Sequence, residues 1–170
     1  MNRLLRLLLW LGGSLLLVQC SSGPKRWVYS YEAGKTCLLL KDQAVPPANI
    51  PEKVLRAVAA GNEIKGKPYR YGGGHAKFDD KGYDCSGTVS YVLHHIGALD
   101  EPTTSGELRR FGKKGEGDWI TVYAKNGHAF IVVAGLRLDT STSGGRDHGP
   151  RWTTVSRSLK GFQARHPAGL

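Results

Sequence analysis

Cys85 is the residue whose neighbours point most directly to chemistry. It stands in the stretch GYDCSGTVSYVLHHIG, residues 82–97, whose periodicity predicts a helix that begins near the cysteine and ends at Gly97. In the first turn of a helix, unpaired backbone N–H groups and the helix dipole stabilise a thiolate, the nucleophilic form of cysteine. A first-turn N–H group, that of Cys85 included, could also stabilise an oxyanion. Four apolar residues predict one buried helix face: Val89, Val92, Leu93 and Ile96.

A cysteine nucleophile needs a base close to it in space. Among the six histidines of the sequence, His128 has the most informative setting. A turn at residues 126–127 precedes it, and the apolar run over residues 129–134 predicts a buried strand. We therefore expect a rigid element to hold the His128 imidazole, as catalysis requires.

Asp139 is the candidate for the residue that orients this base. With a two-residue turn that pairs Val133 with Leu136, His128 and Asp139 become diagonal neighbours on one face of the sheet. Asp139 would then accept a hydrogen bond from one imidazole nitrogen and leave the other nitrogen facing Cys85. A register slip of one residue would move Asp139 to the opposite face.

The elements that would position these residues predict helices first and antiparallel strands after them, which is the α+β class. A first helix is expected over residues 51–65 with Asn49 as its cap, and a short helical turn over residues 105–111. Strands are expected over five segments: 118–123, 128–134, 136–140, 152–155 and 161–165.

The N-terminal residues predict export. A basic start and an apolar run over residues 4–18 are typical of a secretory signal, and the run is short for a membrane span. The sequence LVQC at residues 17–20 resembles a lipobox, in which Cys20 would be lipidated, although Gln19 departs from the usual small residue. Two alternatives are open: a lipoprotein of the outer membrane, or cleavage near Cys20 and secretion. Both predict an exported protein: one of the periplasm or cell envelope in the first case, and a secreted one in the second.

The composition limits the classes of molecule that the protein is expected to bind. The 24 Lys and Arg residues against 14 Asp and Glu residues give a net charge of +10, which suits a polyanionic surface such as a cell wall or anionic lipid. The basic residues are scattered and accompany no nucleic-acid motif, so nucleic-acid binding is not expected. Neither a CxxC nor an HExxH motif is present, and no metal or other cofactor is expected.

Several motifs in a fixed order resemble the NlpC-type cell-wall cysteine peptidases, a papain-like family. The resemblance covers roughly residues 50–170. The motifs that carry it are Tyr69 with Gly72-Gly73, then Asp84-Cys85-Ser86-Gly87, then Gly117-Asp118-Trp119, and last Gly127-His128. It implies an α+β fold in which N-terminal helices pack on a small antiparallel sheet or half-barrel.

The resemblance also implies an activity. Cys85 would be the nucleophile and His128 the general base, while Asp139 holds the place of a polar third residue that is often a second histidine. The substrate would be an amide bond in peptidoglycan stem peptides, typically that from D-γ-glutamyl to the diamino acid. The chain would then comprise a signal over residues 1–20, a linker and hairpin over residues 21–48, and a peptidase domain over residues 49–170.

Further residues are candidates for substrate or oxyanion contacts. Tyr69, Asp84 and Ser86 lie near the cysteine in the motifs, and Arg70, Arg146 and Arg151 could bind substrate carboxylates. The loops over residues 74–83 and 141–151 are longer than the family pattern. These loops would line the groove.

Alternatives to this interpretation remain. A disulfide between Cys37 and Cys85 would remove the thiolate, whereas a free Cys37 would be a small buried hydrophobe. The same scaffold could instead serve an amidase or acyltransferase, and the chain could be a non-catalytic peptidoglycan-binding lipoprotein. A monomer is expected in each case. The hairpin before the first helix is expected to pair residues 27–31 with residues 37–40 and to turn at Gly34.

Overall fold

The computed structural model describes residues 25–141 and 147–170. The predicted signal over residues 1–20, the lipidation candidate Cys20 and the candidate contact Arg146 lie outside the described residues.

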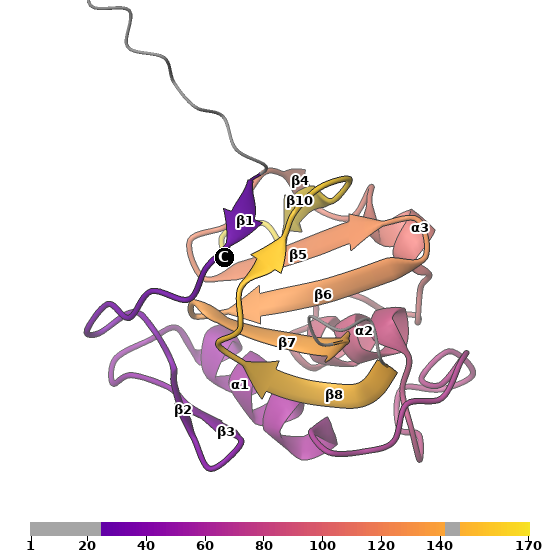
Figure 1. Cartoon of the computed structure of the whole chain (residues 1–170), viewed down its shortest axis with the longest axis horizontal. Coiled ribbons are helices and arrows are strands. Elements are labelled where there is room, and N and C mark those ends of the chain that lie inside the picture. Colours follow the sequence, from indigo (N-terminus) through magenta and orange to yellow (C-terminus); the bar gives the residue numbers. More distant parts are fainter. Residues whose placement is uncertain (1–24, 142–146) are drawn as a thin grey trace, which may run out of the picture.

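A six-stranded antiparallel sheet forms the centre of the molecule, in the order β4-β10-β5-β6-β7-β8 (Figure 1). Neighbours in the sequence pair directly from β5 to β8, so three consecutive hairpins make up most of the sheet. The strands are β4 (Lys113–Lys114), β5 (Ile120–Lys125), β6 (His128–Val133), β7 (Leu136–Ser141), β8 (Asp147–Thr153) and β10 (Gln163–His166).

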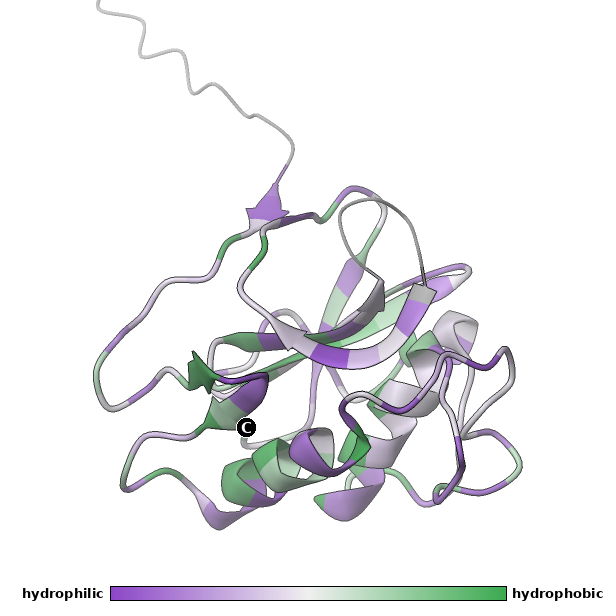
Figure 2. Ribbon diagram, turned by 60° about the horizontal axis from the view of Figure 1, so that its bottom comes forward, coloured by the Kyte–Doolittle hydropathy of each residue, from purple (hydrophilic) through white to green (hydrophobic). Residues whose placement is uncertain are grey.

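Two helices, α1 (Glu52–Ile64) and α2 (Cys85–His95), pack against each other and cover one face of this sheet (Figure 1). A short helix, α3 (Ser105–Leu108), begins with a capping box in which Thr104 and Glu107 satisfy each other's backbone N–H groups. Figure 2 shows hydrophobic colouring on the strands and on the helix faces turned toward them. The α+β arrangement expected from the sequence is confirmed.

The opposite face of the sheet carries a smaller apolar cluster. Strand β6 alternates, so Phe130 and Val132 face away from the helices and pack with Trp27, Tyr123 and Leu159. Above this cluster, β1 (Arg26–Trp27) pairs with β9 (Arg157–Ser158) in a separate two-stranded sheet. The first residues of the described chain are therefore fixed to a segment near its end.

The predicted N-terminal hairpin is wrong in its pairing. The hairpin that forms joins β2 (Leu38–Leu40) to β3 (Gln43–Val45), and it turns at Lys41 and Asp42. Both turn residues have positive φ, of 44° and 63°. Sequences signal such turns mainly through glycine or asparagine, so a Lys-Asp turn gave no signal.

Three further expectations need correction. Asn49 does not cap α1; its φ is 62°, and the N-cap is Pro51, which provides no side-chain hydrogen bond. Strand β8 begins at Asp147, so the loop expected over residues 141–151 is shorter than predicted. Cys37 and Cys85 are both free and buried, which rules out the disulfide alternative.

Within the described part of the chain, no helix has the length and apolar character needed to cross a bilayer.

Gly87 lets the start of α2 touch the glycine-rich loop before it. A Cβ atom at this position would lie 2.0 Å from the carbonyl oxygen of Gly73, and the nearest atoms that it would meet all belong to the backbone. We expect Gly87→Ala to lower the free energy of unfolding by about 1–3 kcal/mol, because no rotamer change relieves the clash. Urea denaturation measures it. In Gly106→Ala the nearest heavy atom would be 3.7 Å away, so this control should stay near wild type.

Candidate active site

The start of α2 is fixed by the carboxylate of Asp84, the N-cap residue. This carboxylate accepts hydrogen bonds from the N–H groups of Gly87, at 2.7 Å, and Gly72, at 3.0 Å. The Thr88 N–H donates to the Asp84 carbonyl oxygen. The N–H groups of Cys85 and Ser86 remain as the donors that a substrate oxyanion could use. Asp84 is thus an acceptor that positions the cysteine, and its contact with the substrate or oxyanion stays a prediction.

His75 lies beside this helix start and was not predicted as a site residue. Its Nε2 atom is 3.1 Å from Asp84 Oδ1 and 3.1 Å from Ser86 Oγ. The residue sits in the long loop that departs from the family pattern, where a histidine has no distinctive spacing. Only the folded loop brings it to the Asp84 carboxylate.

A groove of about 400 Å³ opens at Cys85. It brings together three of the predicted contact residues, Tyr69, Asp84 and Ser86, with the nucleophile candidate. The remaining lining comes from the glycine-rich loop, the start of α3 and the turn before β6. Those residues are Tyr71, Gly72, His75, Thr104, Ser105 and Gly127.

His128 is the first residue of β6, and its position follows from the hairpin register. Val133 pairs with Leu136, and Ala134 and Gly135 form the turn with positive φ, so the predicted register is confirmed. His128 Nε2 lies 3.0 Å from Asp139 Oδ1. The Cys85 thiol also interacts with the His128 ring, and this interaction acts to raise the pKa of the ring.

The environment of His128 favours its protonated form. Burial of the ring acts to lower its pKa, but hydrogen bonds to Asp139 and Cys85 and the charges of these two groups outweigh burial and raise the pKa to about 9. An imidazolium beside the thiol stabilises a thiolate, and it can later give its proton to a leaving group.

The Asp139 carboxylate is almost fully buried, with 1% of the residue exposed, and it is compensated from several sides. Arg157 Nη1 donates to Asp139 Oδ2 at 2.9 Å, and the Ser141 N–H donates to Oδ1 at 3.0 Å. Arg137 adds an ion pair through Nε at 3.5 Å. The acid that faces His128 is therefore held by charge and by hydrogen bonds.

Arg137 and Arg157 are site residues that the sequence analysis missed. Arg137 is buried between the rings of Trp27 and Phe130, at 5.1 and 5.6 Å, and burial lowers its pKa to about 10. Arg157 comes from β9, 18 residues after Asp139 and outside the central sheet. Alternation along β7 could have suggested Arg137, which shares a face with Asp139, but no local signal points to Arg157.

Two predicted contacts do not reach the groove. Arg70 is exposed and its side chain lies along Gly82, outside the groove lining. Arg151 lines a different pocket, described below. In residues 25–141 and 147–170, no group of three or more His, Cys, Asp or Glu side chains could hold a metal ion.

Comparison with known proteins adds the fold to this geometry. No protein-family model and no curated protein sequence matches the chain. The solved structure of the peptidoglycan hydrolase RipB from Mycobacterium tuberculosis matches with a TM-score of 0.52 and 23% identity, over 72% of this chain and 68% of that one. A hypothetical invasion protein of the same organism matches with a TM-score of 0.51 and 23% identity, over 82% of this chain and 71% of that one.

A third solved structure carries a family name. It is an NlpC/P60 family protein from Bacillus cereus, which matches with a TM-score of 0.50 and 16% identity, over 66% of this chain and 39% of that one. The chain has the NlpC/P60 fold. Identity at this level carries the architecture and not the roles of residues, which rest on the geometry above. Within the NlpC/P60 fold, the start of α2 meets the start of β6 at the groove.

Asp139→Asn tests the charge that acts on His128. We expect the His128 pKa to fall well below about 9, because an amide cannot stabilise the imidazolium as a carboxylate does. In the wild type, the stability that protonated His128 contributes is present below pH 6.5 and lost as pH rises through about 9. The variant should lose this dependence. NMR titration of His128 measures this pKa, and the exposed Asp100→Asn is the control. A His128 pKa that stayed near 9 in Asp139→Asn would contradict the expectation.

Arg157→Gln tests the support of the buried acid in the NlpC/P60 fold. Removing one charged donor from the Asp139 carboxylate should lower the free energy of unfolding by about 1–3 kcal/mol, as measured in urea. Arg157→Lys keeps the charge and should recover part of the loss. Arg110→Gln, at an exposed arginine, is the matched control. Equal stability of the Arg157→Gln and Arg110→Gln variants would show that Arg157 does not support Asp139.

Proposed function

We propose that this protein is a cysteine peptidase that hydrolyses an amide bond in the stem peptides of peptidoglycan. One observation carries the proposal: beside an open groove, Cys85 at a helix start interacts with His128, which hydrogen-bonds to the buried Asp139. The likeness in fold to the peptidoglycan hydrolase RipB supports the substrate class.

In the first step, the Cys85 thiolate attacks the carbonyl carbon of the amide. A bond forms between Sγ and this carbon, and the carbonyl oxygen becomes an oxyanion that the N–H groups of Cys85 and Ser86 can stabilise. Protonated His128 then gives its proton to the amide nitrogen. The carbon–nitrogen bond breaks, the amine leaves, and a thioester remains on Cys85.

In the second step, water hydrolyses the thioester. His128, now neutral, takes a proton from the water as the oxygen attacks the carbonyl carbon. The carbon–sulfur bond breaks, which releases the peptide as a carboxylic acid and restores the thiolate beside the imidazolium. The released acid then loses its proton to the solvent. Asp139 keeps the ring orientation through both steps by its hydrogen bond to Nε2.

The proposal also specifies which amide bond is cut and where in the cell the protein acts. The sequence resemblance favours the bond from D-γ-glutamyl to the diamino acid, and a net charge of +10 suits a substrate rich in carboxylates. The signal-like residues 1–20 support export to the cell envelope. Cys20 supplies either a lipid anchor in the outer membrane or the end of a cleaved signal.

Digestion of purified peptidoglycan tests the proposal. Wild-type protein under reducing conditions should release peptide fragments whose masses, read by mass spectrometry, identify the broken bond. Cys85→Ala should lower the rate at least about a thousandfold, since it removes the nucleophile.

Cys37→Ala is the matched control for loss of a cysteine. Burial raises the pKa of the Cys37 thiol to about 11, so this thiol stays protonated and the control should cleave like the wild type. Intact peptidoglycan after wild-type treatment would overturn the proposal in favour of a binding role. Products joined to an added amine would indicate acyl transfer.

A further inference from the structure

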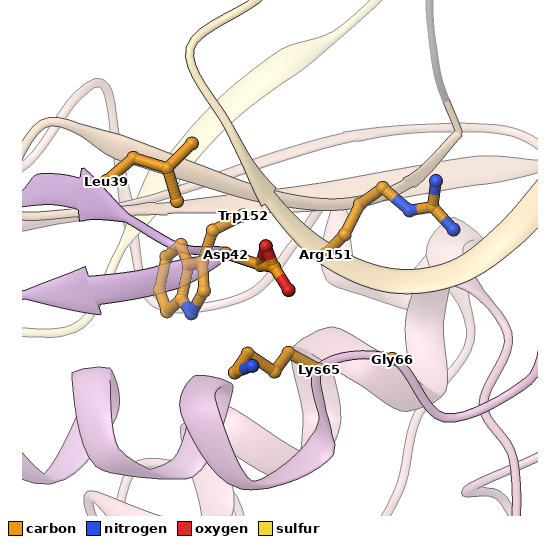
Figure 3. A pocket seen from close by; sticks show the side chains of 6 residues that line it. All are labelled: Leu39, Asp42, Lys65, Gly66, Arg151 and Trp152. Atoms are coloured by element: carbon orange, nitrogen blue, oxygen red, sulfur yellow. The ribbon is translucent and has the colours of Figure 1, made fainter.

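A second pocket, of about 380 Å³, lies apart from the groove at Cys85 (Figure 3). Its volume falls within the range usual for small-ligand sites, which is about 300–1,000 Å³. Three separate segments build it: the β2–β3 hairpin, the end of α1 and the strand β8. The residues that line it are Leu39, Asp42, Lys65, Gly66, Arg151 and Trp152.

The charged side chains that line this pocket form no ion pairs with one another among the described residues. Figure 3 shows Asp42 and Lys65 pointing toward the same space, from the hairpin turn and from the end of α1. Among the ion pairs of the described residues, none involves Asp42, Lys65 or Arg151. The lining therefore carries one carboxylate and two cations, a net charge of +1, although the Arg151 guanidinium extends away from Asp42 and Lys65 (Figure 3). Each of the three could still bind a group of opposite charge.

Buried donors without a partner mark the same pocket. Trp152 is only 4% exposed, and its indole Nε1–H has no hydrogen-bond partner. The Nε atom of Arg151 is also buried without a partner, although its Nη2 donates to the His148 carbonyl oxygen. A Cβ atom on Gly61 would lie 2.3 Å from the Trp152 ring, so the indole packs directly on the α1 backbone. A buried donor without a protein partner is available to a bound molecule, so both groups could donate to a ligand in this pocket.

The pocket lies close to the groove along the chain. Lys65 lines the pocket and Tyr69 lines the groove, and four residues span at most about 14 Å. The Gly66 N–H donates to the Pro150 carbonyl oxygen at 2.9 Å, which fastens this connecting segment to β8. Two linked stem peptides could therefore reach both sites at once.

We propose that this second pocket binds a wall peptide through the free ammonium and the free carboxylate of its diamino acid. Asp42 binds the ammonium, Lys65 and Arg151 bind the carboxylate, and the indole of Trp152 forms the floor. The inference rests on the proposed function, and it adds a non-catalytic site that holds a neighbouring stem peptide while Cys85 acts on another. Binding at two linked positions raises the affinity for cross-linked wall above that for a single peptide.

NMR titration of ¹⁵N-labelled Cys85→Ala protein tests the second site. The probe is a synthetic stem tetrapeptide whose diamino acid keeps its free amine and carboxylate. We expect the Trp152 indole N–H signal, assigned by its loss in Trp152→Phe, to shift and saturate. Adding Lys65→Gln and Arg151→Gln should weaken this binding at least about tenfold, which corresponds to about 1.4 kcal/mol. Lys160→Gln, at an exposed lysine of the β9–β10 segment, is the matched control.

A second probe tests the role of Asp42. Acetylation of the free amine of the same tetrapeptide should weaken the Trp152 response, and Asp42→Asn should weaken the response to the unmodified peptide. A Trp152 signal that does not move, or that moves equally in the Lys65→Gln/Arg151→Gln variant, overturns the second site. The proposed function is decided separately by the release of fragments from digested wall, so failure of one is distinguishable from failure of the other.

Discussion

A carboxylate shut off from water is stable only where donors and opposite charges surround it. Asp139 is such a group, and much of the structure around β7 serves to compensate it. Arg157 and Arg137 bring positive charge, the Ser141 N–H brings a backbone donor, and His128 brings the ring that the charge orients. Because both arginines also lie against aromatic rings, the acid is enclosed by a cluster whose apolar parts exclude water.

A second buried carboxylate sets the other half of the site. Asp84 holds the first turn of α2 and the glycine-rich loop together, and His75 and Ser86 share one of its oxygens. The two acids therefore have different tasks. Asp84 fixes where the thiol stands, and Asp139 fixes how the imidazole is turned toward it. The groove lies where the helix start held by Asp84 meets the imidazole oriented by Asp139.

The parts of this arrangement that depend on local pattern could be predicted from the sequence. The helix that begins at Cys85 and the register that brings His128 to Asp139 follow from periodicity and from a two-residue turn. No local pattern in the sequence predicted the contacts between distant segments. Arg157 reaches Asp139 from outside the central sheet. Strand β1 pairs with β9 rather than within a local hairpin, and the partners Trp27 and Arg157 stand 130 positions apart in the chain. Arg151 was expected at the groove, but its place on an edge strand turns it to another pocket.

The pairing of β1 with β9 has a mechanical consequence. The ladder contains only two residue pairs, Arg26 with Ser158 and Trp27 with Arg157, and short two-stranded sheets are weak. Tension applied to the chain at Lys25 would load this ladder before it loaded the six-stranded sheet. Its rupture would leave β9, which carries Arg157, without its strand partner. A pull on the chain at Lys25 would thus weaken the support that Arg157 gives to Asp139, and with it the orientation of the His128 ring.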